Sequence, residues 1–352
     1  MNIHLKESNL FSMKVLGSLS SYLSSNGKRV LEISAVKSCS VRCKYCPQDL
    51  LIQSVEKADT PKYLTPELFN RVLSNAANHF NEIHWTGYSE PCLNKYLIDL
   101  IKIAHGKGYS QNISTTLVGY PNIIDYVGKS SYFDLKTLHL PDAEGLMTQG
   151  ALTVNQQYLD TLTQFLDNHL YSSPRASRIK VVCFGVNMHP QVKSILSNTK
   201  YSSIIDSPGM IQQFHSRAGS LYNYKHFASL ARLFNFMPTS EKSSQGRDHL
   251  NLLSSIISIV LPSFHYCAYR RLDQPVLLPS GELNICCMDY SLSCKYGNLS
   301  EDTITNINAG WKSNYLNDFA DGKLSACSRC EYYTKFSPLD IIKRKLRQIL
   351  KW

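Results

Sequence analysis

The chain has 352 residues, a formal net charge of +10 and a hydrophobic fraction of 43%. This composition is typical of an ordinary globular protein, and the length suffices for one large domain and a smaller one. No apolar stretch reaches the roughly 18–20 residues that a membrane-spanning helix needs, and the N-terminus lacks the apolar core of a signal peptide. We therefore expect a cytoplasmic protein.

Strand-like and helix-like segments alternate from about residue 30 to residue 190. The predicted strands cover residues 30–35, 82–87, 111–117, 132–138 and 178–186. The predicted helices begin at Thr65-Pro66, where Thr suits the N-cap and Pro the first helical position, and recur at 95–104, 122–127 and 155–166. Repeated β-then-α units predict a parallel sheet with right-handed crossovers, and ligands of such sheets bind beyond the carboxyl ends of the strands.

Three cysteines follow the first predicted strand in the spacing Cys39-x3-Cys43-x2-Cys46, with the aromatic Tyr45 before the last one. In a reducing compartment, clustered cysteines are more often metal ligands than disulfides. Iron–sulfur clusters normally have four thiolate ligands, so three thiolates would leave one iron open for chemistry. Structural zinc is the alternative, although zinc usually takes four Cys or His ligands and no histidine lies at ligand spacing.

A second motif, Gly87-Tyr88-Ser89-Glu90-Pro91, ends the second predicted strand. It places an acid one β/α unit after the cysteines, although a plain turn with an exposed Glu would have the same sequence. Hydroxyl residues Ser114, Thr115 and Thr116 end the third predicted strand, where they either meet a ligand or form a turn. We interpret Cys92 and Cys183 as small buried hydrophobic residues.

Most of the remaining cysteines lie near the C-terminus, where Cys267, Cys286, Cys327 and Cys330 form a candidate set of four ligands. A β-hairpin pattern at 279–286 leads into Cys286, and Cys327-x2-Cys330 has the spacing of a metal-binding turn. Four thiolates suit one further [4Fe–4S] cluster, and structural zinc is again the alternative. The adjacent Cys287 is an alternative ligand to Cys286.

These motifs together resemble the radical S-adenosylmethionine (SAM) superfamily with a C-terminal SPASM or twitch-type auxiliary domain. The resemblance implies a partial (β/α)6 barrel of class α/β, followed by a small α+β domain of a β-hairpin and helices. The expected segments are an N-terminal extension (1–29), the radical SAM core (30–195), the end of the barrel and a connecting region (196–265), the auxiliary domain (266–335) and a C-terminal helix (336–352).

The resemblance also implies roles for individual residues. Cys39, Cys43 and Cys46 would hold a [4Fe–4S] cluster whose open iron binds SAM, and reductive cleavage would yield a 5′-deoxyadenosyl radical. The acid-Pro motif resembles the family's Gly-Gly-Glu-Pro segment, with Ser89 in place of the second Gly. The implied SAM contacts are Tyr45, Gly87, Ser89, Glu90, Ser114, Thr116 and Arg217, the last from a Ser-Arg-Ala-Gly stretch. Cys267, Cys286, Cys327 and Cys330 would hold one auxiliary [4Fe–4S] cluster.

We therefore expect an oxidoreductase-type radical SAM enzyme that modifies a small polar metabolite similar to a sugar or aminocyclitol. A maturase acting on a ribosomal peptide is the alternative within the class, and a non-catalytic iron–sulfur redox sensor is the alternative outside it. Flavodoxin or ferredoxin would supply electrons, and no nucleic-acid partner is expected. Residues 338–352 carry five Lys or Arg against one Asp beside an apolar stripe, which favours a packed helix over one that contacts a membrane surface.

Overall fold

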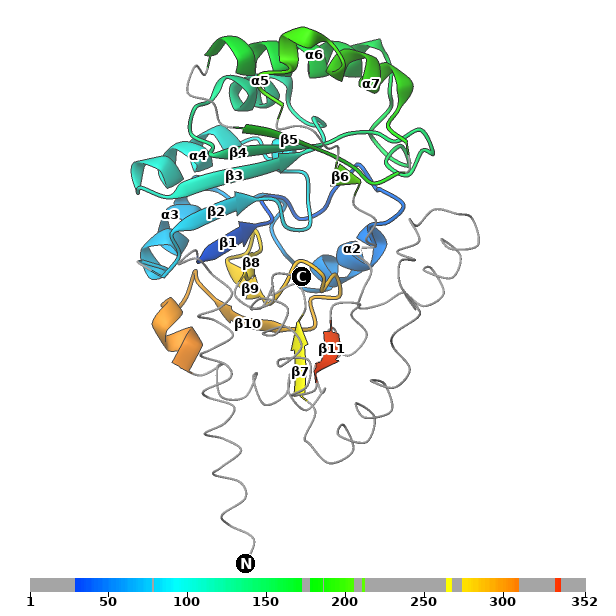
Figure 1. The fold of residues 1–352 in the computed structure, drawn as a ribbon. Helices are drawn as coiled ribbons and strands as arrows, with labels where there is room; N and C mark the ends of the chain where they lie inside the picture. The colour runs from blue at the N-terminus through cyan, green and yellow to red at the C-terminus, as the bar shows by residue number, and fades with distance from the viewer. Residues whose placement is uncertain are drawn as a thin grey trace, which may run out of the picture.

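The computed structural model describes residues 29–77, 79–172, 178–185, 187–205, 211–212, 264–267, 274–309 and 333–336. Six parallel strands lie side by side in chain order, which confirms the predicted α/β fold of repeated β/α units (Figure 1). These strands are β1 (Val30–Ile33), β2 (Glu82–Trp85), β3 (Ser110–Thr115), β4 (Leu135–His139), β5 (Arg178–Cys183) and β6 (Ile211–Gln212). The carboxyl ends of all six strands therefore meet at one edge of the sheet.

Three more strands extend the sheet beyond β1. Strand β8 (Val276–Leu277) pairs parallel to β1, and β9 (Glu282–Asn284) and β10 (Lys295–Asn298) follow in antiparallel order. The predicted hairpin is confirmed, and Gly281 at its turn has a φ of +88°, a value that favours glycine. Strands β7 (Phe264–Cys267) and β11 (Tyr333–Phe336) form a separate antiparallel pair. The hairpin is thus continuous with the sheet that carries the cysteine loop.

The helices pack in sequence along the sheet, each against the next, through α3 (Pro66–Asn75), α4 (Leu97–Gly106), α5 (Pro121–Lys129), α6 (Gln156–Ser172) and α7 (Pro190–Leu196). Helix α3 begins at its predicted cap, where the Thr65 side chain accepts a hydrogen bond from the Leu68 amide. Helices α2 (Gln48–Lys57) and α7 were not predicted from the sequence. Neither has a side-chain cap, although α7 begins with Pro190 at its first helical position, so only α2 lacks both of these local start signals.

Alternate residues of the strands face the helices. Trp85 packs on Phe69 of α3 with ring centroids 5.4 Å apart, and Gln111 donates to the Ile101 carbonyl of α4 over 3.1 Å. On β4 the ammonium of the buried Lys136 donates to the Gly128 carbonyl of α5 over 2.9 Å. The next residues along the strands therefore face the opposite side of the sheet.

A second, smaller core lies apart from the main one and joins α2 to the C-terminal hairpin. We call it the second core, and its buried residues are Leu51, Val55, Tyr88, Val276, Leu278, Cys287, Tyr290 and Leu292, with Cys46 and Leu50 packed against them. Its members come from three distant parts of the chain. The second core therefore packs the end of the cysteine loop against the turn that follows β9.

Candidate functional site

The loop after β1 carries Cys39, Cys43 and Cys46, and backbone hydrogen bonds fix its path. The Cys46 amide donates to the Cys43 carbonyl over 2.9 Å, which makes a tight turn. The loop is tied on its other side to the segment after β4, since the Lys44 amide donates to the Leu146 carbonyl over 2.7 Å. Arg42 has a φ of +50°, so the turn holds one non-glycine residue in the left-handed region. The three cysteines are partly exposed, unlike Cys92 and Cys183, which are buried as predicted.

The three cysteines lie close enough for the thiolate charge of one to affect the pKa of another. Burial raises the pKa of Cys39 to about 12, and negative charge on Glu90, Cys46 and Cys43 adds to that rise. In the part of the chain that the structure describes, no three Cys, His, Asp or Glu are placed to hold a single metal ion. A cubane cluster distributes its thiolates over separate irons, so its ligands need not share one ion. Three partly exposed thiols on one ordered loop fit such a cluster.

Gln48, the first residue of α2, braces this loop. Its carbonyl oxygen accepts from the Cys39 amide over 3.0 Å, and its amide nitrogen donates to the Cys46 sulfur over 3.3 Å. The same nitrogen donates to the Tyr88 carbonyl over 2.7 Å. Gln48 is buried, and it links the first and last cysteines of the loop to the motif after β2.

The predicted SAM-binding turn packs closely on the end of β1. Gly87 has a φ of +66°, and a Cβ at this position would lie 2.9 Å from the Ser34 amide nitrogen. The Ser89 hydroxyl lies 3.1 Å from the Ser34 hydroxyl and accepts from the Val36 amide over 3.3 Å. Glycine is therefore required at residue 87 by both its conformation and its close approach, while Ser89 is used to hold the turn against β1.

Glu90 is buried, and its carboxylate accepts four hydrogen bonds from the chain. One oxygen accepts from the Thr115 hydroxyl over 2.7 Å and from the Cys92 amide over 3.1 Å. The other accepts from the Thr116 amide over 2.6 Å and from the Thr116 hydroxyl over 2.7 Å. Burial raises the pKa of Glu90, and these hydrogen bonds oppose the rise. A carboxylate has about four acceptor positions, so the chain itself fills them all.

Glu90 and Thr116, two of the predicted cofactor-binding residues, are in direct contact in the structure. Ser114 lies on β3, two residues before Thr116, and is partly buried. Tyr45 packs against Phe184, which follows β5, with the rings tilted by 31° and their centroids 4.2 Å apart. Phe184 in turn stacks on His139 at the end of β4, with centroids 5.3 Å apart. Tyr45 is thus an aromatic wall on the same edge of the sheet as Glu90.

The C-terminal cysteine turn lies directly against this site. The Tyr88 hydroxyl donates to the Cys286 carbonyl over 2.5 Å and accepts from the side-chain Nδ2 of Asn284 over 2.6 Å. Cys286 is partly exposed, whereas Cys287 is buried in the second core. Cys286 is therefore the more accessible of the two adjacent thiols.

Several predicted residues lie outside the described residues or are described only in part. Cys327, Cys330 and Arg217 lie outside the described residues. So does the basic C-terminal helix predicted at 336–352, apart from Phe336, which is the last residue of strand β11. Cys267 is described as the last residue of β7, without its side chain. Their roles remain predictions.

Three residues that the structure places at the site were not predicted from the sequence. Gln48, Tyr88 and Tyr290 contact the cysteines through the hydrogen bonds that their side chains make. Thr115 was a candidate among the hydroxyl residues at the end of the third predicted strand, and it donates to Glu90. The fold alone brings the other three to the cysteines, and Tyr290 is separated from Cys46 by 244 residues.

No protein-family model and no curated protein sequence matches this chain. Solved structures resemble it in fold. BtrN in complex with AdoMet and 2-DOIA is 15% identical over 87% of this chain and 93% of that one, with a TM-score of 0.42. SuiB of Streptococcus suis bound to precursor peptide SuiA is 12% identical over 92% of this chain and 74% of that one, with a TM-score of 0.46.

A third neighbour, native anSMEcpe with bound AdoMet, is 14% identical over 86% of each chain, with a TM-score of 0.47. BtrN and anSMEcpe were solved with AdoMet bound, and SuiB with its precursor peptide. At these identities and TM-scores the likeness concerns the fold and assigns no activity. The function of this chain is therefore argued from its own residues.

Proposed function

We propose that this chain is a radical SAM enzyme whose cluster site is the loop of Cys39, Cys43 and Cys46. The observation that carries the proposal is the joining of this loop to the Gly87–Glu90 turn. The Gln48 side chain contacts Cys39 and Cys46, the first and last cysteines of the loop, and also the Tyr88 carbonyl within the turn. Three thiolates beside an acid-containing turn suit a cluster with one open iron, because nothing in the loop supplies a fourth thiolate.

When bound at this site, the cluster would supply the electron that cleaves SAM and begins radical chemistry on a substrate. The chain's own contribution is binding, orientation and exclusion of water. In this proposal Tyr45 and Ser114 line the SAM site, and the backbone of Gly87 and Ser89 forms its floor. Arg217 stays a proposed carboxylate ligand on sequence grounds alone.

Glu90 requires a specific adjustment in this proposal. Its four hydrogen bonds leave no open acceptor position, so an amino group of SAM must replace one of them. Two of the donors are hydroxyls, which can turn away without moving the backbone, and of these Thr116 is partly exposed whereas Thr115 is buried. Thr116 would then be released to donate to another atom of the cofactor.

We further propose that Cys267, Cys286, Cys327 and Cys330 hold one auxiliary [4Fe–4S] cluster in a domain that spans about 266–335. The partial exposure of Cys286, against the burial of Cys287, favours Cys286 as the ligand. An auxiliary cluster near the substrate would accept an electron and so favour an oxidation. This outcome suits an oxidoreductase-type reaction.

A small polar metabolite is the substrate class that we favour. The face of the sheet opposite the helices carries Glu82, His84 and Asn112, where His84 lies 2.6 Å from Glu82 and 2.9 Å from Asn112. These groups hydrogen-bond to one another, and Glu82 begins β2, away from the carboxyl ends of the strands, so the preference for a polyol or an amine rests on the resemblance of the sequence motifs. A ribosomal peptide is the alternative, and flavodoxin or ferredoxin in the cytoplasm would supply electrons.

The test is SAM cleavage by the anaerobically reconstituted protein with dithionite as reductant. We expect 5′-deoxyadenosine from the wild type, none from Cys43→Ala, and wild-type amounts from Cys183→Ala, which removes a buried thiol outside the loop. We also expect about eight irons per chain, from two four-iron clusters. Iron binding without SAM cleavage in the wild type would favour the redox-sensor alternative.

A further inference from the structure

Tyr290 belongs to the turn after β9, yet its hydroxyl lies 3.0 Å from the sulfur of Cys46. The side chain is fully buried, and its ring packs edge-on against Tyr88 with centroids 5.0 Å apart. A thiolate bound to iron carries no proton, so in that state only the phenol can donate. The contact is then a hydrogen bond from Tyr290 to a cluster ligand.

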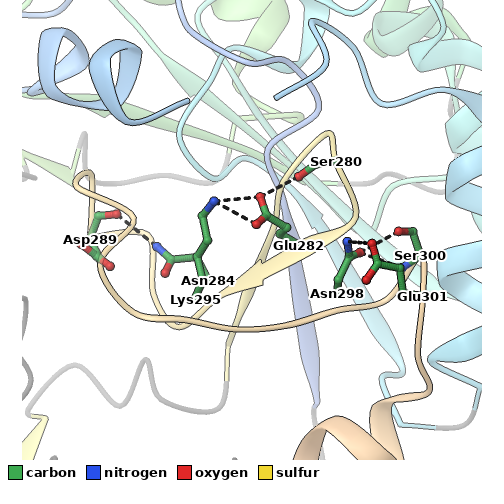
Figure 2. A network of polar contacts seen from close by, with 8 residues as sticks. All are labelled: Ser280, Glu282, Asn284, Asp289, Lys295, Asn298, Ser300 and Glu301. Atoms are coloured by element: carbon green, nitrogen blue, oxygen red, sulfur yellow. Dashed lines mark hydrogen bonds and ion pairs between the residues drawn. The ribbon is translucent and has the colours of Figure 1, made fainter. Parts of the chain in front are cut away.

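The turn that carries Tyr290 is held by its own polar network. The Asp289 carboxylate accepts from the hydroxyls of Ser291 and Ser293, over 2.6 and 3.1 Å, and from the Cys294 amide over 2.8 Å. Asn284 of β9 donates to the Asp289 carbonyl over 3.1 Å, as Figure 2 shows beside the Lys295–Glu282 ion pair of the hairpin. These contacts fix the backbone on both sides of Tyr290.

The second core fixes the other side of the contact. Tyr290, Leu278 and Val276 pack there against Leu51 and Val55 of α2, the helix that begins directly after the cysteine loop. The phenol therefore cannot leave the sulfur without disturbing a buried hydrophobic cluster. Gln48 donates to the same sulfur over 3.3 Å, so Cys46 has two donors from opposite ends of the chain.

We propose that Tyr290 is a positioning residue that raises the reduction potential of the cluster held by Cys39, Cys43 and Cys46. The inference rests on the proposed function. Reduction adds one negative charge to the cluster, and a hydrogen bond to a ligand sulfur stabilises the more negative state more strongly. The phenol thereby eases the reduction that SAM cleavage requires.

The proposal also gives the C-terminal turn a role at the first cluster. Tyr290 is four residues beyond Cys286, and the Tyr88 hydroxyl links the Cys286 carbonyl to the turn after β2. A change in the bonding of Cys286 would therefore reach the Cys46 sulfur through a short, buried path. Side-chain contacts thus connect the proposed auxiliary ligand Cys286 to the cysteine loop that would hold the SAM cluster.

The test is a redox titration of the reconstituted protein, followed by the EPR signal of the reduced cluster that is lost in Cys43→Ala. Tyr290→Phe keeps the ring and removes only the hydroxyl. We expect the ratio of reduced to oxidised cluster at a fixed potential to fall about tenfold, which is a shift of about 59 mV for one electron. The control Tyr201→Phe removes a hydrogen bond of 2.8 Å to Asp167 from another buried tyrosine and should leave the potential unchanged.

Resonance Raman spectra in H₂O and D₂O supply a second readout. The iron–sulfur stretches of the wild type should shift in D₂O, because the Tyr290 hydroxyl and the Gln48 amide both donate exchangeable protons to the Cys46 sulfur. The shift should be smaller in Tyr290→Phe, which keeps only the Gln48 donor. Equal potentials in wild type and Tyr290→Phe, or no isotope shift in the wild type, would overturn the inference while leaving SAM cleavage intact. Loss of all iron-binding at the cysteine loop would instead overturn the proposed function and this inference together.

Discussion

Replacing Glu90 by Gln tests the hydrogen-bond arrangement on which the site is built. A Gln amide has one oxygen and one NH₂ group in place of two carboxylate oxygens. If the NH₂ group replaces the oxygen that Thr116 contacts, the Thr116 amide loses its acceptor at 2.6 Å, and if it replaces the other oxygen, the Cys92 amide loses its acceptor at 3.1 Å. Either orientation leaves one buried backbone N–H unsatisfied.

An unsatisfied buried donor costs about 1–3 kcal/mol, so we expect Glu90→Gln to lower the free energy of unfolding by that amount. The Thr115 and Thr116 hydroxyls turn to accept from the new amide, so they add little to the loss. Removing a buried charge offsets part of it, since burial raises the pKa of Glu90. We therefore expect the lower half of the range.

The assay is urea unfolding followed by circular dichroism under anaerobic conditions. Glu56→Gln is the matched control, because Glu56 is exposed on α2 and the same exchange there should change stability by less than about 0.5 kcal/mol. Indistinguishable midpoints for Glu90→Gln and Glu56→Gln would refute the account of Glu90 as the acceptor for two backbone amides.

Three further predictions follow from the packing of the site and of the sheet. Gly87→Ala should destabilise the protein by about 1–2 kcal/mol, because an alanine would be strained at a φ of +66° and its Cβ would crowd Ser34. The control is Gly106→Ala, whose added Cβ would have no atom within 4 Å and should not destabilise the protein. Thermal unfolding of the two variants makes the comparison. Gln48→Leu should reduce the iron bound after reconstitution, since it removes contacts to Cys39 and Cys46; iron analysis that finds the wild-type content would contradict this role. Burial lowers the pKa of Lys136 to about 7, so the unfolded state binds more protons between about pH 7 and 10. Stability should rise with pH in that window, by up to about 1.4 kcal/mol per pH unit, and Lys136→Met should remove the slope in urea unfolding at several pH values.

The sequence predicts well the elements that have local signals. The strands from β1 to β5 appear where β-rich runs end in turn residues, and α3 begins at its Thr65-Pro66 cap. Helix α2 has no such cap and is stabilised by the second core, which forms only when residues after 274 return to the sheet. Periodicity along one segment cannot reveal a contact of this kind.

The same distinction applies to the site. Cysteine spacing identifies the loop, because a cluster needs its ligands close together in space and short spacing provides that directly. The partners of those cysteines depend on tertiary structure instead. Tyr290 and Tyr88 have ordinary surroundings in the sequence, and their hydroxyls reach Cys46 and Cys286 only through the pairing of β8 with β1. Glu90 was predicted as an acid near the cofactor, but its four internal hydrogen bonds follow from the neighbouring ends of β2 and β3.

The most direct test of the central claim is the EPR spectrum, with and without SAM, of the reduced protein in which both Cys327 and Cys330 are replaced by Ala. This double variant keeps only two of the four proposed auxiliary ligands, too few for that cluster, so the remaining signal should come from the cluster of Cys39, Cys43 and Cys46. An open iron that binds SAM should change its spectrum when SAM is added. A cluster signal that depends on Cys43 and is identical with and without SAM would contradict the claim that these three thiolates leave an iron open for the cofactor.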